Sequence, residues 1–287
     1  MNGLLLVGHG SRSPESVKEM QAIADLVAAS APDAMVRLGF LEMSDPPAGA
    51  ALDELVDQGC RPVVVAPLML LGAGHSKSDV PAVALEARER HPGVDIRMGS
   101  PLGVAHALVA TLGDAVLLAG GGGLPLLVLA RGTSDPDANG DAHKAARLVA
   151  EWTSAPFVHT AFSGVTGPLV PEGLDVFARL GYERMAVAFW FLCSGALVQR
   201  ARRDIDAFTA RTGVKVVDAG YLGPDDRLVP VILERYRAAV DGEAPIVNCD
   251  LCAYRAAWPG REDRIAQPVG VGHSHLALEH RRVEHHH

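Results

Sequence analysis

Two histidines and one glutamate stand where three apolar runs of the sequence end. His9 lies in "LLLVGHGS", Glu42 in "FLEMS" and His75 in "GAGHSKSD". Two imidazoles and a carboxylate form a suitable ligand set for a divalent first-row transition metal, and the same groups accept protons near neutral pH. The glycines beside both histidines let backbone approach a ligand closely. We therefore expect a site that binds a metal and removes protons.

The alternative for each histidine is that it only caps a turn after its strand, and the alternative for Glu42 is that it faces solvent. Two histidines that follow corresponding strands are harder to explain as turn residues than one. The pair therefore favours functional use of both.

The elements that position these residues alternate between apolar strands and amphipathic helices. Strands are predicted at 3–9, 34–40, 61–70 and 94–100, and helices at 14–31, 46–59, 77–92 and 103–119. This order predicts an α/β fold with a parallel sheet and helices on both faces. Ligands of such sheets bind beyond the carboxyl ends of the strands, where the three residues lie.

The second half of the sequence repeats the first. The offset is 122 residues from His9 to Arg131 and from Phe40 to Phe162, 121 from Gly74 to Gly195, and 120 from Gly103 to Gly223. We predict two duplicated domains, 1–120 and 121–241, related by a pseudo-two-fold axis with a cleft between their facing strand ends, and an extension at 242–287.

The two repeats differ at the positions that carry chemistry. Arg131, Gly164 and, within one residue, Ala196 stand in the second repeat where His9, Glu42 and His75 stand in the first. The first repeat is therefore expected to be catalytic, and the degenerate second repeat to bind substrate.

Composition excludes several classes of function. The chain has 287 residues, 48% of them hydrophobic, and a formal charge of −8, so no basic stripe is available for nucleic acid. No apolar stretch is long enough to span a membrane, and the segment before His9 indicates a first strand rather than a signal peptide. We expect a cytoplasmic protein in which Cys60 and Cys193 are core residues.

Resemblance to the class II tetrapyrrole chelatases is carried by "LLLVGHGSRSPES", "FLEMSDPP" and "VVVAPLMLLGAGHSKSDVP". The sequence is similar to the long, two-repeat form of sirohydrochlorin cobaltochelatase or ferrochelatase over about residues 1–240. This resemblance implies ATP-independent insertion of Co²⁺ or Fe²⁺, as a substrate, into sirohydrochlorin on the route to cobalamin or sirohaem. It implies that His9 and His75 bind metal and accept pyrrole protons, assisted by Glu42.

A sirohydrochlorin-type tetrapyrrole carries many carboxylates, so an acidic protein needs local cations and hydroxyls to bind it. The candidate contacts of the two repeats are Ser11, Arg12, Ser13 and Lys77, and Arg131, Thr133 and Ser134. The alternative for the second set is a helix-capping loop. The run Arg200, Arg202 and Arg203 predicts a solvated helix face, with substrate contact as the alternative.

The extension contains a Cys-x-x-Cys pair, Cys249 and Cys252, followed by His273 and His275. One such pair cannot complete a tetrahedral thiolate site alone. It predicts either an iron–sulfur cluster shared across a dimer, a second metal site formed with these histidines, or two unligated thiols.

Three alternatives to this function remain at the level of sequence. Two histidines and a glutamate do not select the metal, so nickel insertion is one. A tetrapyrrole or metal carrier without turnover is another. A two-lobed periplasmic binding protein is disfavoured by the predicted absence of a signal peptide. The sequence is compatible with a monomer or a homodimer.

Overall fold

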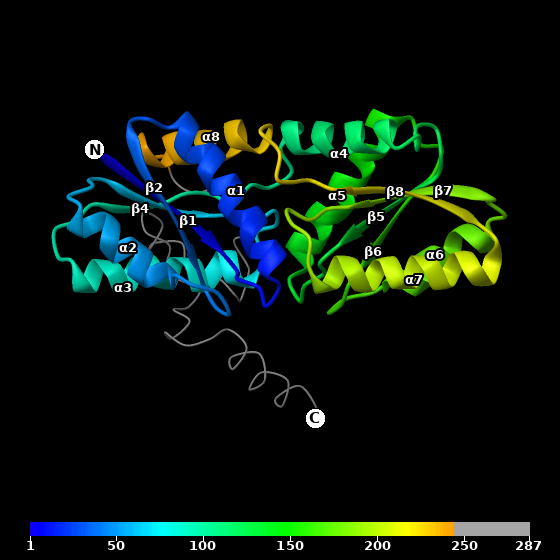
Figure 1. Ribbon diagram of the computed structural model, residues 1–287, viewed down its shortest axis with the longest axis horizontal. Coiled ribbons are helices and arrows are strands. Elements are labelled where there is room, and N and C mark those ends of the chain that lie inside the picture. Colours follow the sequence, from blue (N-terminus) through cyan, green and yellow to red (C-terminus); the bar gives the residue numbers. More distant parts are fainter. Residues whose placement is uncertain (244–287) are drawn as a thin grey trace, which may run out of the picture. The chain divides into compact units, whose positions relative to one another are not determined.

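The computed structural model describes residues 1–243, which form two compact units, each built around a parallel four-stranded sheet (Figure 1). The predicted metal or iron–sulfur site at Cys249, Cys252, His273 and His275 lies outside the described residues.

The first sheet has the strand order β2-β1-β3-β4 and the second has the order β6-β5-β7-β8. All neighbouring strands are parallel. The first-sheet strands are β1 (Asn2–Gly8), β2 (Ala34–Phe40), β3 (Val63–Pro67) and β4 (Ile96–Met98), and the second-sheet strands are β5 (Leu126–Ala130), β6 (Val158–Phe162), β7 (Arg184–Phe189) and β8 (Lys215–Tyr221). The identical topology confirms the predicted α/β fold and its duplication.

Helices connect the strands of each sheet, as the alternating sequence pattern predicts. They are α1 (Pro14–Ser30), α2 (Ala48–Asp57), α3 (Val80–Arg90), α4 (His106–Leu118), α5 (Pro136–Thr153), α6 (Val170–Arg179), α7 (Ala196–Thr212) and α8 (Leu228–Val240). In the second unit, α6 and α7 lie on one face of the sheet and α4 and α5 on the other (Figure 1). The helix predicted at 77–92 forms as α3, which begins at Val80 and follows a single π-helical turn, η1 (His75–Asp79).

The compact units do not coincide with the two sequence repeats. The first contains residues 1–12 and 24–103 and the described chain from Ile232 onward, and the second contains residues 13–23 and 104–231. The helix that ends the first repeat, α4, contacts β7 and β8 of the second sheet. Conversely, Arg97 at β4 donates hydrogen bonds to the carbonyls of Ala239 and Val240 at the end of α8. Each repeat thus supplies its last helix to the unit formed mainly by the other.

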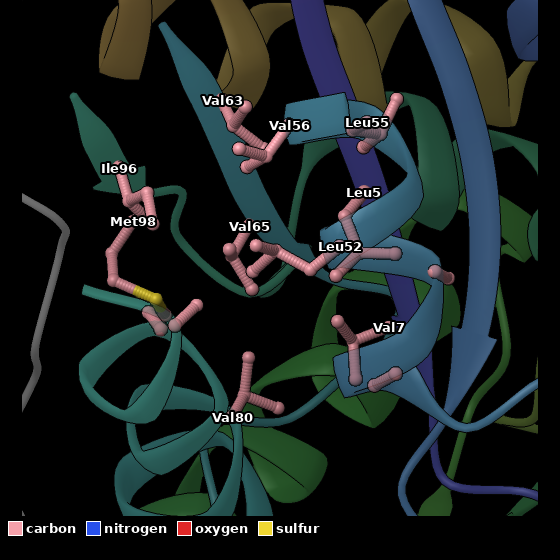
Figure 2. Packing of buried hydrophobic residues seen from close by; sticks show 14 of the residues in the cluster. Leu5, Val7, Leu52, Leu55, Val56, Val63, Val65, Val80, Ile96 and Met98 are labelled. Carbon is pink, nitrogen blue, oxygen red and sulfur yellow. The ribbon is translucent and has the colours of Figure 1, made fainter. Parts of the chain in front are cut away.

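The core of the first unit forms because apolar residues occupy both faces of its strands. Leu5, Val7, Val63 and Val65 point to the face covered by α2 and α3, where they pack with Leu52, Leu55, Val56 and Val80 (Figure 2). Strand residues between them, such as Leu6 and Val64, are equally buried. Near-continuous β-branched and leucine runs are typical of strands covered on both faces.

Cys60 and Cys193 are buried free thiols, as predicted for core residues. Burial, together with the negative charge of Glu19, raises the pKa of Cys193 to about 12. This thiol is therefore uncharged and weakly nucleophilic at neutral pH. No helix within residues 1–243 has the length and hydropathy needed to cross a membrane.

Truncation of the α2 core should destabilise the protein in proportion to burial. Leu52 is fully buried, so Leu52→Ala is expected to lower the free energy of unfolding by about 2–5 kcal/mol. Leu118→Ala is the matched control, because that side chain is 88% exposed and its loss should cost less than about 0.5 kcal/mol. Urea unfolding followed by circular dichroism measures both, and equal midpoints would contradict the assignment of Leu52 to the core.

Candidate active site

Three adjacent strands of the first sheet bring the predicted site residues to one edge. His9 is the first residue after β1, Glu42 is the second after β2, and His75 begins η1 in the connection that follows β3. Since β2, β1 and β3 are neighbours and parallel, their carboxyl ends lie side by side. The sheet therefore assembles residues that are far apart in the sequence.

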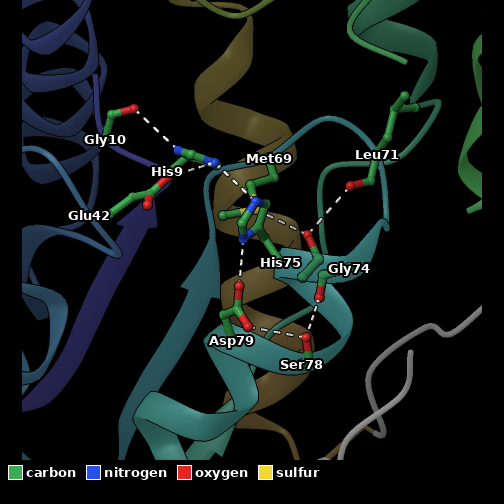
Figure 3. A network of polar contacts seen from close by, with 10 residues as sticks. His9, Gly10, Glu42, Met69, Leu71, Gly74, His75, Ser78 and Asp79 are labelled. Atoms are coloured by element: carbon green, nitrogen blue, oxygen red, sulfur yellow. Dashed lines mark hydrogen bonds and ion pairs between the residues drawn. The ribbon is translucent and has the colours of Figure 1, made fainter. Parts of the chain in front are cut away.

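The side chains of His9, His75 and Glu42 converge (Figure 3). The Nε2 atoms of the two histidines are 3.0 Å apart, and His9 Nε2 is 3.3 Å from Glu42 Oε1. The imidazole rings meet nearly at right angles, with centroids 4.3 Å apart. Between a quarter and a third of the surface of each of these side chains is exposed, so the group is open to a ligand.

The spacing of the two Nε2 atoms suits shared coordination of one cation. Metal–nitrogen bonds of about 2.0–2.1 Å place two adjacent imidazole nitrogens roughly 3 Å apart on one ion. No three His, Cys, Asp or Glu side chains within residues 1–243 form a preassembled metal-binding group. The arrangement therefore offers two nitrogen ligands and a nearby carboxylate, which leaves other coordination positions to water or to a second ligand.

Asp79 orients His75, and sequence reasoning did not assign it a role. His75 Nδ1 donates to Asp79 Oδ2 at 2.5 Å, and Ser78 Oγ donates to Asp79 Oδ1 at 3.2 Å (Figure 3). A carboxylate that holds the Nδ1–H leaves the Nε2 lone pair of the same ring directed at the site. The sequence signal for this contact is the four-residue spacing from His75 to Asp79, which puts both on one face of a helical turn.

Gly10 lets the loops after β1 and β2 pack backbone against backbone. Leu41 N donates to Gly8 O and Glu42 N to His9 O, which extends the contact between the strands into the loops. Gly10 has φ +98°, and a Cβ on it would lie 1.7 Å from the Glu42 carbonyl oxygen. Gly10 is therefore required by the neighbouring loop rather than by the approach of a ligand, which is the role predicted from the sequence.

The predicted substrate contacts of the first repeat lie in different environments. Ser11 exchanges hydrogen bonds with Ser44, whose Oγ accepts from Ser11 N and donates to Ser11 O. Arg12 is exposed and Ser13 is half-buried. Lys77 is only 3% exposed, which differs from the accessible cation that the sequence predicted.

In the second repeat, Arg131 directly follows β5 and is exposed, as is Ser134. Thr133 belongs to a capping turn: its N donates to Asn139 Oδ1, and its Oγ1 accepts from Asp135 N. Asp135 then caps α5 by accepting from Asp137 N. Thr133 therefore takes part in the helix-capping loop that is the alternative to substrate binding at this position.

The fold and the site define a class of protein: a duplicated parallel α/β chain that carries a His–His–Glu group at one edge of a sheet. The family model described as CbiX matches it twice, over residues 3–117 and 125–239. The chain belongs to the CbiX family.

Relatives within this similarity include the sirohydrochlorin cobaltochelatase of Priestia megaterium, which is 35% identical over 89% of this chain and 85% of its own length. The sirohydrochlorin ferrochelatase of Bacillus subtilis is 28% identical over 88% and 98%. The solved structure of SirB from Bacillus subtilis with Fe³⁺ superimposes with a TM-score of 0.75 at 26% identity, covering 84% of this chain and 97% of SirB.

Removal of the Asp79 carboxylate should weaken metal binding at His75. Asp79→Ala frees the Nδ1–H that orients the ring, and loss of such a contact typically lowers metal affinity by about 10–100-fold. Isothermal titration of the folded variant with Co²⁺ measures this loss. Asp53→Ala is the control, because Asp53 on α2 makes a similar 2.7 Å contact to His91, which directly follows α3, away from the site. Equal Co²⁺ affinity in the two variants would refute the role of Asp79.

Proposed function

We propose that this protein inserts a divalent metal, Co²⁺ or Fe²⁺, into sirohydrochlorin, with His9, His75 and Glu42 as the catalytic group. The observation that carries the proposal is the 3.0 Å convergence of the two Nε2 atoms beside a carboxylate. Support comes from membership in the CbiX family and from similarity, along most of both chains, to a sirohydrochlorin cobaltochelatase.

Metal insertion demands the two properties that this group combines. Two pyrrole N–H protons must leave while a hydrated cation exchanges water for pyrrole nitrogens, so the protein needs weak metal ligands and proton acceptors in one place. Neutral imidazole serves either purpose. An incomplete ligand set suits a metal that is a substrate, because the protein must release the ion to the macrocycle.

Each histidine has a carboxylate that stabilises its protonated form. Glu42 Oε1 lies beside His9 Nε2, and Asp79 holds His75 Nδ1. A proton taken from a pyrrole nitrogen by either imidazole produces an imidazolium next to a negative charge. The positive charges formed during insertion are thereby compensated within the site.

The substrate contacts we propose are those at the carboxyl ends of β1, β5 and the β3 connection. Arg12, Arg131 and Ser134 are accessible, whereas Ser11, Ser13, Lys77 and Thr133 are partly or fully engaged in the fold. Arg12 and Arg131 are therefore the two exposed cations of this set, and a guanidinium group matches acetate and propionate in charge and geometry.

Catalysis is tested by anaerobic optical spectroscopy of metal-free sirohydrochlorin with Co²⁺, Fe²⁺ or Ni²⁺ in separate runs. Acceleration over the enzyme-free rate is expected with Co²⁺ or Fe²⁺. Pigment binding without acceleration by any of the metals would instead establish a carrier. A faster rate with Ni²⁺ than with the other two ions would identify a nickel chelatase.

Loss of either site histidine should abolish insertion while the fold persists. His9→Ala and His75→Ala are each expected to lower the turnover number by at least about two orders of magnitude, the scale of lost acid–base catalysis. His91→Ala, which removes the histidine paired with Asp53, is the matched control and should retain normal turnover. Near-normal rates in either site variant would defeat the assignment.

A further inference from the structure

In the second repeat, the positions that correspond to the catalytic group carry positive charge. Arg131 corresponds to His9 and Gly164 to Glu42, both at an offset of 122 residues. His75 and Ala196 each begin the helix after the third strand, so at an offset of 121 Arg200 corresponds to Asp79. Two imidazoles and two carboxylates in one unit are thus replaced by two guanidinium groups and no carboxylate in the other.

Ser163 contacts both arginines within the second unit. Its Oγ donates to the Arg131 carbonyl at 2.9 Å, and its own carbonyl accepts from Arg200 Nη2. Arg200 Nη2 also lies 3.9 Å from the position a Cβ would take on Gly164. Desolvation and the nearby positive charge of Arg200 lower the pKa of Arg131.

Neither guanidinium has a carboxylate partner among residues 1–243, although the chain as a whole is acidic. On the same helix, Arg202 is paired with Asp218 and Arg211 with Asp175. Two neighbouring cations without a counter-charge repel each other, and an anion placed between them relieves that repulsion. Arg131 and Arg200 are therefore suited to bind an anionic ligand.

The loop that contains Gly164 also exposes an apolar residue. Val165 follows Gly164, is 66% exposed and has φ +69°, a conformation that a β-branched residue adopts only at a cost. Met43, its counterpart beside Glu42, shares the positive φ, at +59°. A ligand that meets both Val165 and the arginines presents an apolar body with an anionic substituent.

We infer that Arg131 and Arg200 together bind one peripheral carboxylate of the tetrapyrrole, with Val165 in contact with the adjoining apolar ring. The inference rests on the proposed function, which identifies sirohydrochlorin as the molecule that carries the carboxylate. It assigns Arg200, which the sequence pattern placed on a solvated helix face, to substrate binding. Guanidinium groups match carboxylates in charge and in hydrogen-bond geometry.

Equilibrium binding of metal-free sirohydrochlorin, followed by its fluorescence, tests the shared carboxylate. Arg131→Gln and Arg200→Gln should each raise the Kd about tenfold or more, the scale of a lost charge-assisted hydrogen bond. The double variant should lose less than the product of the two factors, because both arginines hold one group. Arg203→Gln, on the same helix, is the control for net charge and should bind normally. Single variants that bind as tightly as Arg203→Gln, or losses that multiply fully, would overturn the inference.

Gly164→Glu provides a second test, because it introduces into the second repeat the carboxylate that Glu42 provides in the first. A carboxylate here should pair with the arginines and raise the Kd at least as much as either arginine variant. Gly164→Gln is the isosteric control and should bind almost normally, since among residues 1–243 the nearest group to a Cβ at this position is Arg200 Nη2, at 3.9 Å. Equal affinities of the Glu and Gln variants would contradict an anion site.

The insertion assay separates this inference from the proposed function. Arginine-dependent pigment binding without accelerated insertion would support the carboxylate site and reject catalysis. Accelerated insertion with unchanged Kd in the arginine variants would do the reverse. A wild-type protein that binds no sirohydrochlorin would overturn both.

Discussion

The close backbone contact between the loops after β1 and β2 determines the geometry of the candidate site. His9 and Glu42 sit on two loops joined by hydrogen bonds, and Gly10 allows the loops to approach to a distance that any side chain would prevent. Because His9 immediately precedes Gly10, a shift of this loop would move its imidazole away from both His75 and Glu42. The same contact recurs in the second unit, where a Cβ on Gly132 would lie 2.1 Å from the Gly164 carbonyl oxygen.

The two units thus share their backbone geometry, whereas the side chains at the strand ends differ. Both units keep the strand order, the glycine contact and a positive φ in the residue after Glu42 or Gly164. What changed is the set of side chains at these positions, from two histidines and two carboxylates in the first unit to two arginines in the second. This separation illustrates how one fold carries different chemistry through the residues at its loops.

The sequence was sufficient to predict the fold and the position of His9, Glu42 and His75 at one edge of the first sheet. Apolar runs between amphipathic helices specify a parallel sheet, and residues just after adjacent strands must then meet at one edge. The contact of His75 with Asp79 was harder to predict from the sequence, because it depends on the local π-helical turn. The burial of Lys77, the contact of Arg200 with Ser163 and the exchange of α4 and α8 depend on packing between distant segments, which periodicity along the chain does not encode.

The exchange of terminal helices has a consequence for the order in which the protein forms on the ribosome. All residues of the second unit have been synthesised once Val231 is added, whereas the first unit, which begins at Met1, still lacks the part of α8 that starts at Ile232. Domains generally fold as their segments emerge, usually beginning with the N-terminal one. Here the unit that bears His9 and His75 is started first and completed second, so the candidate active site gains its full support only after α8 has been synthesised.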